Sequence, residues 1–308
     1  MNFRASIDIG SNSVLLLVAK LNGENLDVVE NHSNVTSLGR DLDTNGYFHK
    51  ESMIDTYNVL KEYKNICDKY SITSHKIIAT ATEASRVASN SREFFTNVKK
   101  ELGINVKLIT GEAEAFFSSI GIMFDKKIVG SDVVVMDIGG ASTELIKMNT
   151  FNRSIKYSFS MPVGAVRMMD WQRDGVLDKN LNKVIEEYEV ELMNMRTKKL
   201  FCVAGTMTSV GNIYLGNESF IEDQVNTLEF ETINLSKMLT RFKDFTAEEL
   251  LQKYPFLGKR SKTIYPGLIL ADKITSILNS KSVYISTFGL RYGTLLTGLV
   301  EEKYEFGK

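Results

Sequence analysis

The stretch IDIGSNSVLLLV, residues 7–18, decides the fold because the chain repeats its pattern as MDIGGASTELIK, residues 136–147. In each copy an apolar run ends in aspartate, and Ile-Gly, a loop of small or hydroxylated residues and a second strand-like run follow. Asp8 and Asp137 are 137 − 8 = 129 residues apart, a longer period than that of solenoid repeats. The repeat therefore predicts a duplicated supersecondary unit, with one copy in each half of the chain.

Each copy has the composition of a phosphate-binding loop. Glycines at 10, 139 and 140 allow a tight turn and let a ligand approach the backbone. Backbone amides and nearby hydroxyl groups make a donor-rich concavity that suits phosphate oxygens; the hydroxyl groups are those of Ser11, Ser13, Ser142 and Thr143. Plain Gly/Ser hairpins are the alternative, but two matching loops favour a functional site.

The aspartate before each loop predicts a metal ion. A carboxylate alone would repel phosphate, and its natural use is to hold a hydrated Mg²⁺ against the phosphate oxygens, directly or through water. Asp8 and Asp137 are therefore candidate metal ligands, with strand-end caps as the alternative for both.

Composition indicates a two-domain protein without an overall basic field. The 308 residues are 43% hydrophobic, and 37 Lys and Arg nearly balance 38 Asp and Glu. A polyanionic ligand therefore needs locally clustered basic side chains. Cys67 and Cys202 show neither zinc spacing nor a disulfide framework and are interpreted as buried small residues. The three histidines have no mutual metal spacing.

Strand-like and helical stretches alternate, which predicts α/β layers with a partly parallel sheet. The N-terminus has no signal-peptide pattern, and no apolar run reaches 18 residues, so we expect a cytoplasmic protein. The expected strands are Ser6–Ile9, Val14–Leu17, Lys76–Ile78, Val106–Ile109, Val133–Met136, Thr143–Ile146 and Leu200–Val203. The expected helices include Glu51–Tyr70, Arg92–Leu102, Glu112–Met123, Lys179–Met195, Lys262–Leu278 and Leu290–Val300.

An ordered set of motifs resembles one family. Two DIG-type loops half a chain apart resemble the actin-like ATPase superfamily. Further blocks resemble the exopolyphosphatase and guanosine pentaphosphate phosphohydrolase family: ATEASRVASN (81–90), TGEAEAFFS (110–118), DIGGASTEL (137–145), MPVGAVRM (161–168), VAGTMTSVG (203–211), KRSKTIYPGL (259–268) and STFGLRYG (286–293). The set covers nearly the whole chain. Ala141 departs from it, because the family's second loop usually has a third glycine there.

The resemblance implies a duplicated actin-like (ribonuclease H-like) α/β fold with two lobes and an active-site cleft between them. We expect the first lobe over residues 1–124, joined by a C-terminal helix at about 291–308 that crosses back. The second lobe is expected over residues 125–290. The chain resembles the short, two-domain form of the family.

The resemblance also implies roles for individual residues. Glu114, rather than Glu112, is expected to activate the attacking water; a first-turn acid that complements the helix dipole is the alternative. Asp137, Glu144 and Asp8 are expected to hold the metal ion, with a cross-strand salt bridge nearly as good an interpretation of Glu144. The expected phosphate-binding residues are Gly10, Ser11, Asn12, Ser13, Arg86, Gly139, Gly140, Ala141, Ser142, Thr143 and Arg260.

The two arginines in that set have structural alternatives. Arg86 lies one helical turn after Thr82, and its guanidinium suits bidentate phosphate contacts; an i, i+3 ion pair with Glu83 is the alternative. Arg260 belongs to the densest basic cluster, with Lys259 and Lys262. Most such clusters are only solvated, but the matching block and a polyanionic substrate favour phosphate binding.

The resemblance implies a phosphohydrolase that uses Mg²⁺ or Mn²⁺ to release orthophosphate from inorganic polyphosphate or guanosine pentaphosphate. No nucleic acid or membrane partner is expected, and a homodimer is one option for assembly. A non-catalytic sensor of guanosine tetra- or pentaphosphate, or of polyphosphate, is the alternative from another class, and a sugar kinase is a third. Glu114 favours hydrolysis over sensing, and no sugar-binding acid motif supports a kinase.

Overall fold

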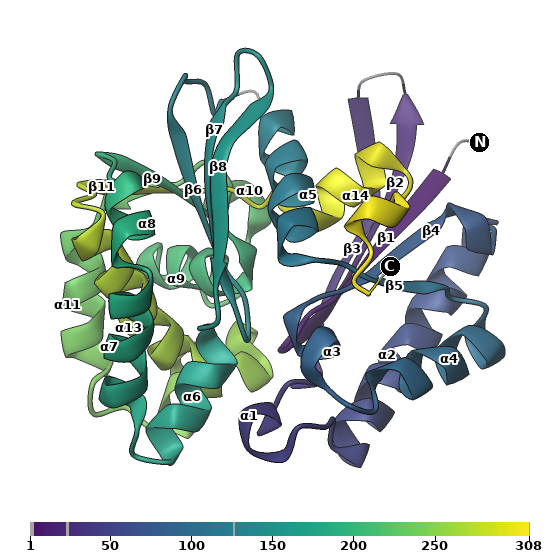
Figure 1. Cartoon of the computed structure of the whole chain (residues 1–308), viewed down its shortest axis with the longest axis horizontal. Coiled ribbons are helices and arrows are strands. Elements are labelled where there is room, and N and C mark those ends of the chain that lie inside the picture. The colour runs from purple at the N-terminus through teal and green to yellow at the C-terminus, as the bar shows by residue number, and fades with distance from the viewer. Residues whose placement is uncertain (1–2, 23–24, 126, 308) are drawn as a thin grey trace. The chain divides into compact units, whose positions relative to one another are not determined.

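The computed structural model describes residues 3–22, 25–125 and 127–307. The chain divides into two compact units, residues 1–121 with 290–308, and residues 122–289 (Figure 1). The expected lobe boundaries lie within a few residues of these divisions. Residues 1, 2 and 308, which belong to the expected first lobe, lie outside the described residues.

The first unit contains a five-stranded sheet in the order β3-β2-β1-β4-β5. The first three strands are antiparallel neighbours, whereas β4 and β5 continue parallel to β1. The strands are β1 (Phe3–Ile9), β2 (Ser13–Asn22), β3 (Asn25–Val35), β4 (Ile77–Ala81) and β5 (Val106–Leu108).

Helices cover this sheet on both faces. The main core packs under α2 and α4, and alternate residues of β1, namely Ala5, Ile7 and Ile9, are buried in it. Because side chains alternate along a strand, Ser6 and Asp8 face the other side, where the Ser6 and Thr294 hydroxyl groups are 2.7 Å apart. The helical segments are α1 (Leu42–Asn45), α2 (Lys50–Lys69), η1 (Ser74–Lys76), α3 (Glu83–Val87), α4 (Ser91–Leu102), α5 (Gly111–Phe124), α14 (Leu290–Thr297) and η3 (Glu302–Tyr304).

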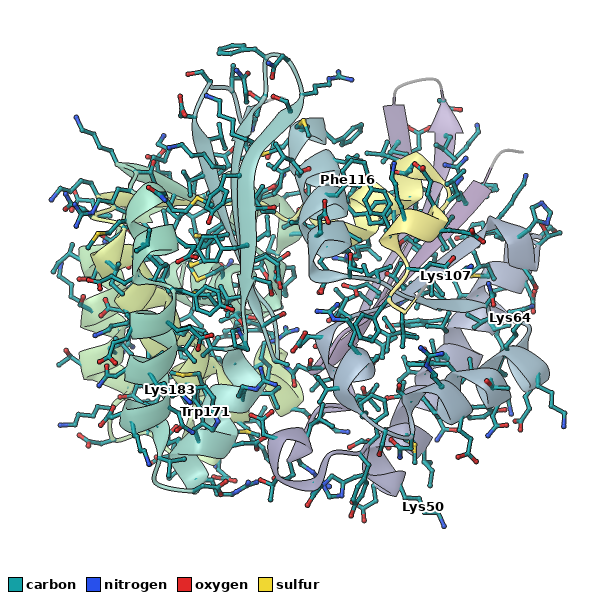
Figure 2. All side chains as sticks on the ribbon, in the orientation of Figure 1. Lys50, Lys64, Lys107, Phe116, Trp171 and Lys183 are labelled. Atoms are coloured by element: carbon teal, nitrogen blue, oxygen red, sulfur yellow. The ribbon has the colours of Figure 1, made fainter. Side chains whose placement is uncertain are left out.

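The C-terminal segment packs on α5. Phe116, which Figure 2 labels, stacks on Tyr304 with ring centroids 4.7 Å apart, and Phe117 is fully buried. Gly293 of α14 comes so close to α5 that a Cβ atom there would lie 1.8 Å from the Phe117 carbonyl oxygen. The two phenylalanines are therefore packing residues.

The second unit repeats the topology of the first. Its sheet has the order β10-β11-β9-β6-β7-β8, and β6, β7, β8, β9 and β11 pair as β1, β2, β3, β4 and β5 do. This correspondence confirms the duplicated α/β fold. The strands are β6 (Val133–Ile138), β7 (Thr143–Asn149), β8 (Ser154–Met161), β9 (Lys199–Val203), β10 (Glu229–Glu231) and β11 (Ser282–Ile285).

Helices of the second unit form its main core against one face of this sheet, where Val134, Met136 and Ile138 are buried. Asp137 therefore lies on the opposite face, as Asp8 does in the first unit. The helical segments are α6 (Ala165–Arg173), α7 (Leu177–Glu187), α8 (Glu189–Asn194), α9 (Ala204–Tyr214), α10 (Glu222–Val225), α11 (Ile233–Phe242), α12 (Ala247–Lys253), η2 (Pro255–Arg260) and α13 (Ser261–Ile277).

The predicted extents of two helices were wrong. The helix expected at about 291–308 ends at Thr297, because Gly298 adopts a left-handed conformation with φ +77°. The helix expected over Lys179–Met195 is two helices, since Tyr188 leaves the helical conformation between α7 and α8.

Cys67 and Cys202 are buried free thiols, and burial raises the pKa of Cys67 to about 12, as suits small core residues. Within the described ranges, no helix is both long and apolar enough to cross a membrane.

Candidate active site

The two repeated loops form the same hairpin. In the first unit the Gly10 amide donates to the Ser13 carbonyl at 2.9 Å, and in the second the Gly139 amide donates to the Ser142 carbonyl at 3.0 Å. Neither glycine has a positive φ. Close packing explains why residue 139 is glycine, because a Cβ atom there would lie 3.1 Å from the Ser142 carbonyl oxygen.

The carbonyl groups of the first hairpin are tied back by the segment after β3. The Ser11 carbonyl accepts from the Gly39 amide at 2.7 Å, and the Asn12 carbonyl accepts from the amides of Thr36 and Ser37 at 3.0 and 2.9 Å. No motif in the sequence predicted these contacts. They fix the orientation of the peptide groups in the hairpin.

The segment after β8 does the same for the second hairpin. The Gly139 carbonyl accepts from the Ala165 amide at 2.9 Å, and the Gly140 carbonyl accepts from the amides of Val166 and Arg167 at 2.8 and 3.2 Å. Gly164 is needed for this approach, because a Cβ atom there would lie 2.6 Å from the Gly140 carbonyl.

These contacts orient amide donors away from the tying segments. In a planar trans peptide the C=O and the following N–H point in opposite directions, and none of the described peptide bonds is cis. The N–H groups of Asn12 and Ser13 therefore point away from residues 36–39, and those of Gly140 and Ala141 point away from α6. Consecutive amides aimed to one side make an anion-binding concavity.

Ala141 and Thr143 of the second hairpin are predicted phosphate-binding residues with different surroundings. Ala141 has no positive φ, so its methyl group in place of the family's glycine brings no left-handed strain. Thr143 is fully buried, and its hydroxyl donates to the Val163 carbonyl at 2.6 Å. In this conformation the Thr143 hydroxyl supports the hairpin by holding the segment after β8.

A row of oxygen-bearing side chains lies beside the second hairpin. Asp137 pairs with Glu144 across β6 and β7, and Glu144 pairs with Ser160 across β7 and β8. Directly opposed residues share a face of the sheet. Glu144 is 3% exposed and accepts a 2.7 Å hydrogen bond from the Ser160 hydroxyl, a contact that the sequence did not indicate.

This row fits a hard divalent cation. Mg²⁺ is commonly held by one or two carboxylates, with waters and substrate phosphate completing its shell. The residues that the structure describes contain no group of three or more His, Cys, Asp and Glu arranged to hold a metal ion. Asp8 belongs to the first unit, where its antiparallel partner on β2 is Leu15, so that unit does not repeat the carboxylate pair.

Glu114 and Arg86 are in direct contact in the first unit. Thr110 immediately precedes α5, and its hydroxyl accepts from the Ala113 amide at 3.1 Å; Glu114 lies in the first turn of the helix. Glu114 is 7% exposed. Arg86 Nη1 donates to Glu114 Oε2 at 2.7 Å and to the Ile109 carbonyl at 2.6 Å.

Glu83 completes this cluster. Arg86 Nη2 donates to Glu83 Oε2 at 2.6 Å, the ion pair that was the structural alternative for Arg86. Burial by itself lowers the pKa of Arg86, but Glu114 and Glu83 outweigh it, and the pKa is raised above its ordinary value. In this conformation the guanidinium orients Glu114, and any phosphate contact by Arg86 would compete with these carboxylates.

Arg260 lies over the first turn of α9. Its Nη1 is 3.3 Å from the Ser209 hydroxyl oxygen, and a Cβ atom on Gly205 would lie 2.6 Å from its Nη2. Lys259 and Lys262 are exposed, whereas Arg260 is half-buried. Arg260 is therefore the least exposed member of the basic cluster.

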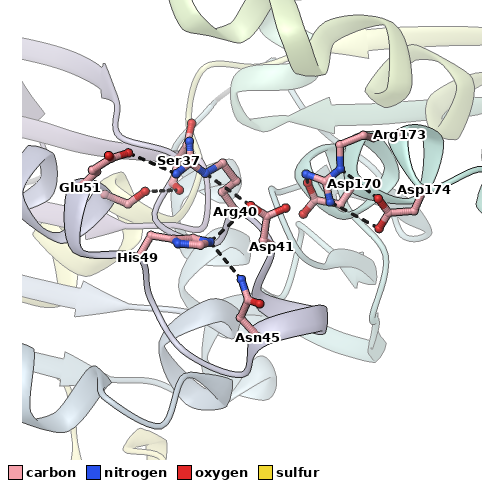
Figure 3. A network of polar contacts seen from close by, with 10 residues as sticks. Ser37, Arg40, Asp41, Asn45, His49, Glu51, Asp170, Arg173 and Asp174 are labelled. Atoms are coloured by element: carbon pink, nitrogen blue, oxygen red, sulfur yellow. Dashed lines mark hydrogen bonds and ion pairs between the residues drawn. The ribbon is translucent and has the colours of Figure 1, made fainter.

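A polar network follows the segment that ties the first hairpin (Figure 3). Arg40 is 3.5 Å from Glu51, Asp41 is 3.3 Å from His49 Nε2, and Asn45 Nδ2 is 3.1 Å from the same nitrogen. These contacts hold the turn after Gly39. His49 thus has a structural role in this turn.

Comparisons with known proteins agree on one family. The model of the Ppx/GppA phosphatase family matches residues 17–302. A bifunctional 3-dehydroquinate synthase/phosphatase of Fusobacterium nucleatum is 28% identical over 321 residues; the match covers 97% of this chain and 47% of that protein, so the chain spans about half its length. Exopolyphosphatase 2 of Mycobacterium tuberculosis is 30% identical, with 90% of this chain and 91% of that protein covered. The crystal structure of an Aquifex aeolicus Ppx/GppA family member has a TM-score of 0.76 at 28% identity, and 96% of both chains is covered.

Proposed function

The chain belongs to the Ppx/GppA phosphatase family, and from that premise we propose that it is a metal-dependent phosphohydrolase that releases orthophosphate from inorganic polyphosphate or guanosine pentaphosphate. The observation that carries this proposal is the repeated hairpin with its carbonyl groups tied back. Two copies of a loop that presents several amides to one side suit a substrate made of linked phosphates, because each phosphate offers oxygens that accept from such amides.

The cluster of Arg86 and Glu114 supports hydrolysis over binding alone. Phosphoanhydride cleavage needs a water positioned in line with the leaving oxygen, and a carboxylate that orients it and accepts its proton. Glu114 is buried and held by Arg86 at 2.7 Å, so its carboxylate has a fixed direction. A surface acid that served only the helix dipole would need no such partner.

The proposed metal ligands are Asp137 and Glu144 of the second unit. A bound Mg²⁺ or Mn²⁺ supplies charge that offsets the negative charge of the phosphoryl oxygens. Glu144 is kept in place by Ser160, and we propose that this hydrogen bond aims the carboxylate at the cation.

The proposed reaction is a single displacement. The oxygen of water attacks the terminal phosphorus, the bond from that phosphorus to the bridging oxygen breaks, and the shortened phosphate chain leaves with the bonding electron pair. Glu114 accepts the proton of the attacking water, and the amides of the two hairpins hold phosphate oxygens. Catalysis then rests on positioning and electrostatics, and no covalent enzyme intermediate is required.

Orthophosphate release tests the proposal. The purified protein is incubated with polyphosphate and with guanosine pentaphosphate, each with Mg²⁺ and each with a chelator. We expect release from at least one substrate, and we expect the chelator to stop it. Tight binding of either compound without phosphate release would favour a sensor of the same fold, and release that the chelator leaves unchanged would remove the metal from the proposal.

A further inference from the structure

Arg167 is a buried charged residue beside the second hairpin, and the catalytic proposal gives it no role. It occupies the first turn of α6, between the buried residues Val166 and Met168, and is itself 8% exposed. Burying a guanidinium is costly unless acceptors surround it. Its Nη1 donates to the Ala141 carbonyl at 2.7 Å, the next carbonyl after the two that the backbone of α6 ties.

This hydrogen bond sets the direction of one more amide. Because the peptide group is planar and trans, holding the Ala141 carbonyl toward Arg167 turns the Ser142 N–H to the opposite side. With the Gly140 and Ala141 amides already turned, three consecutive donors then point away from α6. A charged donor on the carbonyl also polarises the peptide group, which strengthens the hydrogen bond that its N–H makes.

In the first hairpin, different donors hold the equivalent carbonyl group. The residue equivalent to Ala141 is Asn12, since 141 − 129 = 12, and its carbonyl accepts from the backbone amides of Thr36 and Ser37. The second hairpin therefore has a charged side chain where the first has neutral backbone donors. A purely structural contact would not need the charge, whereas an anion on the other side of the peptide group benefits from it.

We propose that Arg167 is a positioning residue for anion binding by the second hairpin: it fixes the Ser142 amide toward the phosphate and contributes positive charge behind it. The proposal rests on the proposed function only in that the second hairpin binds phosphate. It does not require that the bound phosphate be cleaved.

The test measures anion binding separately from turnover. The probe is imidodiphosphate, a hydrolysis-resistant analogue of pyrophosphate, and its dissociation constant is measured by calorimetry. Arg167→Met removes both charge and donor, Arg167→Gln removes the charge alone, and Arg167→Lys keeps the charge and one donor. We expect the dissociation constant to rise about 10- to 100-fold in the Met variant, the usual worth of a charge-assisted hydrogen bond. The Gln variant should be intermediate, and the Lys variant should stay within about threefold of wild type.

Arg241→Met is the matched control, because Arg241 is an exposed arginine of the same unit, on α11. Its dissociation constant should equal that of the wild type. Denaturant unfolding of every variant without the anion measures stability, and the Gln and Lys variants provide the comparison should the Met variant not fold.

The outcomes separate this proposal from the proposed function. Met, Gln and Lys variants that lose stability but bind imidodiphosphate as the wild type does would make Arg167 a purely structural residue and overturn the inference. A second outcome is that the wild-type protein binds imidodiphosphate, with dissociation constants in the expected order among the variants, yet releases no orthophosphate from either substrate. That result would support the positioning role of Arg167 and refute the proposed hydrolysis. Wild-type protein that binds no anion would refute both.

Discussion

Replacing Glu114 by glutamine tests the catalytic proposal most directly. The amide has the shape of the carboxylate, so its oxygen can accept the hydrogen bond that Arg86 Nη1 now makes at 2.7 Å. The variant keeps the side chain in place but removes the group that accepts the proton of water. A general base of this kind is worth about 10²–10⁴ in turnover.

The structure also bounds the loss of stability. Arg86 keeps its contacts with Glu83 and with the Ile109 carbonyl, and its bond to residue 114 changes from charge-assisted to neutral. That exchange is worth about 1–2 kcal/mol, against a typical unfolding free energy of about 5–15 kcal/mol. The variant therefore stays folded, and a 10²–10⁴ loss, equal to about 2.7–5.4 kcal/mol of activation free energy, must come from the chemical step.

The assay compares turnover, Michaelis constant and unfolding free energy for Glu114→Gln and Glu112→Gln. Glu112 lies in the same first turn of α5 and is the matched control for the helix dipole. We expect the Glu114 variant to lose turnover with little change in Michaelis constant, and the Glu112 variant to keep both. Near-normal turnover in a stable Glu114 variant, or equal losses in the two variants, would refute the reasoning.

Three further predictions address the metal, the substrate and the packing. Asp137→Asn should lower phosphate release and weaken its dependence on Mg²⁺ in a metal titration, whereas Asp27→Asn on the exposed part of β3 should change neither; wild-type activity that resists a chelator would contradict this. Arg260→Ala should raise the Michaelis constant for long polyphosphate more than for a short chain, and equal increases would instead place Arg260 at the reacting phosphate. Gly293→Ala should lower the unfolding free energy by about 1–3 kcal/mol, because its Cβ atom would meet the Phe117 carbonyl at 1.8 Å; an unchanged denaturation midpoint would refute that.

The secondary structure was predictable where one pattern dominated. The apolar runs around Asp8 and Asp137 identified the paired strands of both hairpins. The edge strands β3 and β8 were not predicted, because many of their side chains are polar and half-buried or exposed and so give no clear apolar pattern. The last helix was predicted too long, since a single glycine at position 298 ends it by adopting a positive φ.

The contacts among the candidate site residues were not predictable from the sequence. Glu114 and Arg86 were each selected from their motifs, yet nothing in the sequence joins two residues 28 positions apart. Arg167 lay within a matched block, and its apolar neighbours were the one sign that its charge would be buried. Thr143 was assigned to phosphate from its hydroxyl group, whereas the fold uses that hydroxyl to hold Val163.

The sequence by itself determined the duplication, the α/β class and the two loops, because these depend on local periodicity and on a repeat that is visible along the chain. Only the tertiary structure decided which way the loop amides point and which acceptors Arg86 and Arg167 hold. The reason is physical: a peptide group turns toward whichever donor takes its carbonyl, and a buried charge is paired with whatever the fold brings to it. In both hairpins those partners come from a segment more than twenty residues further along the chain, after the third strand of the sheet.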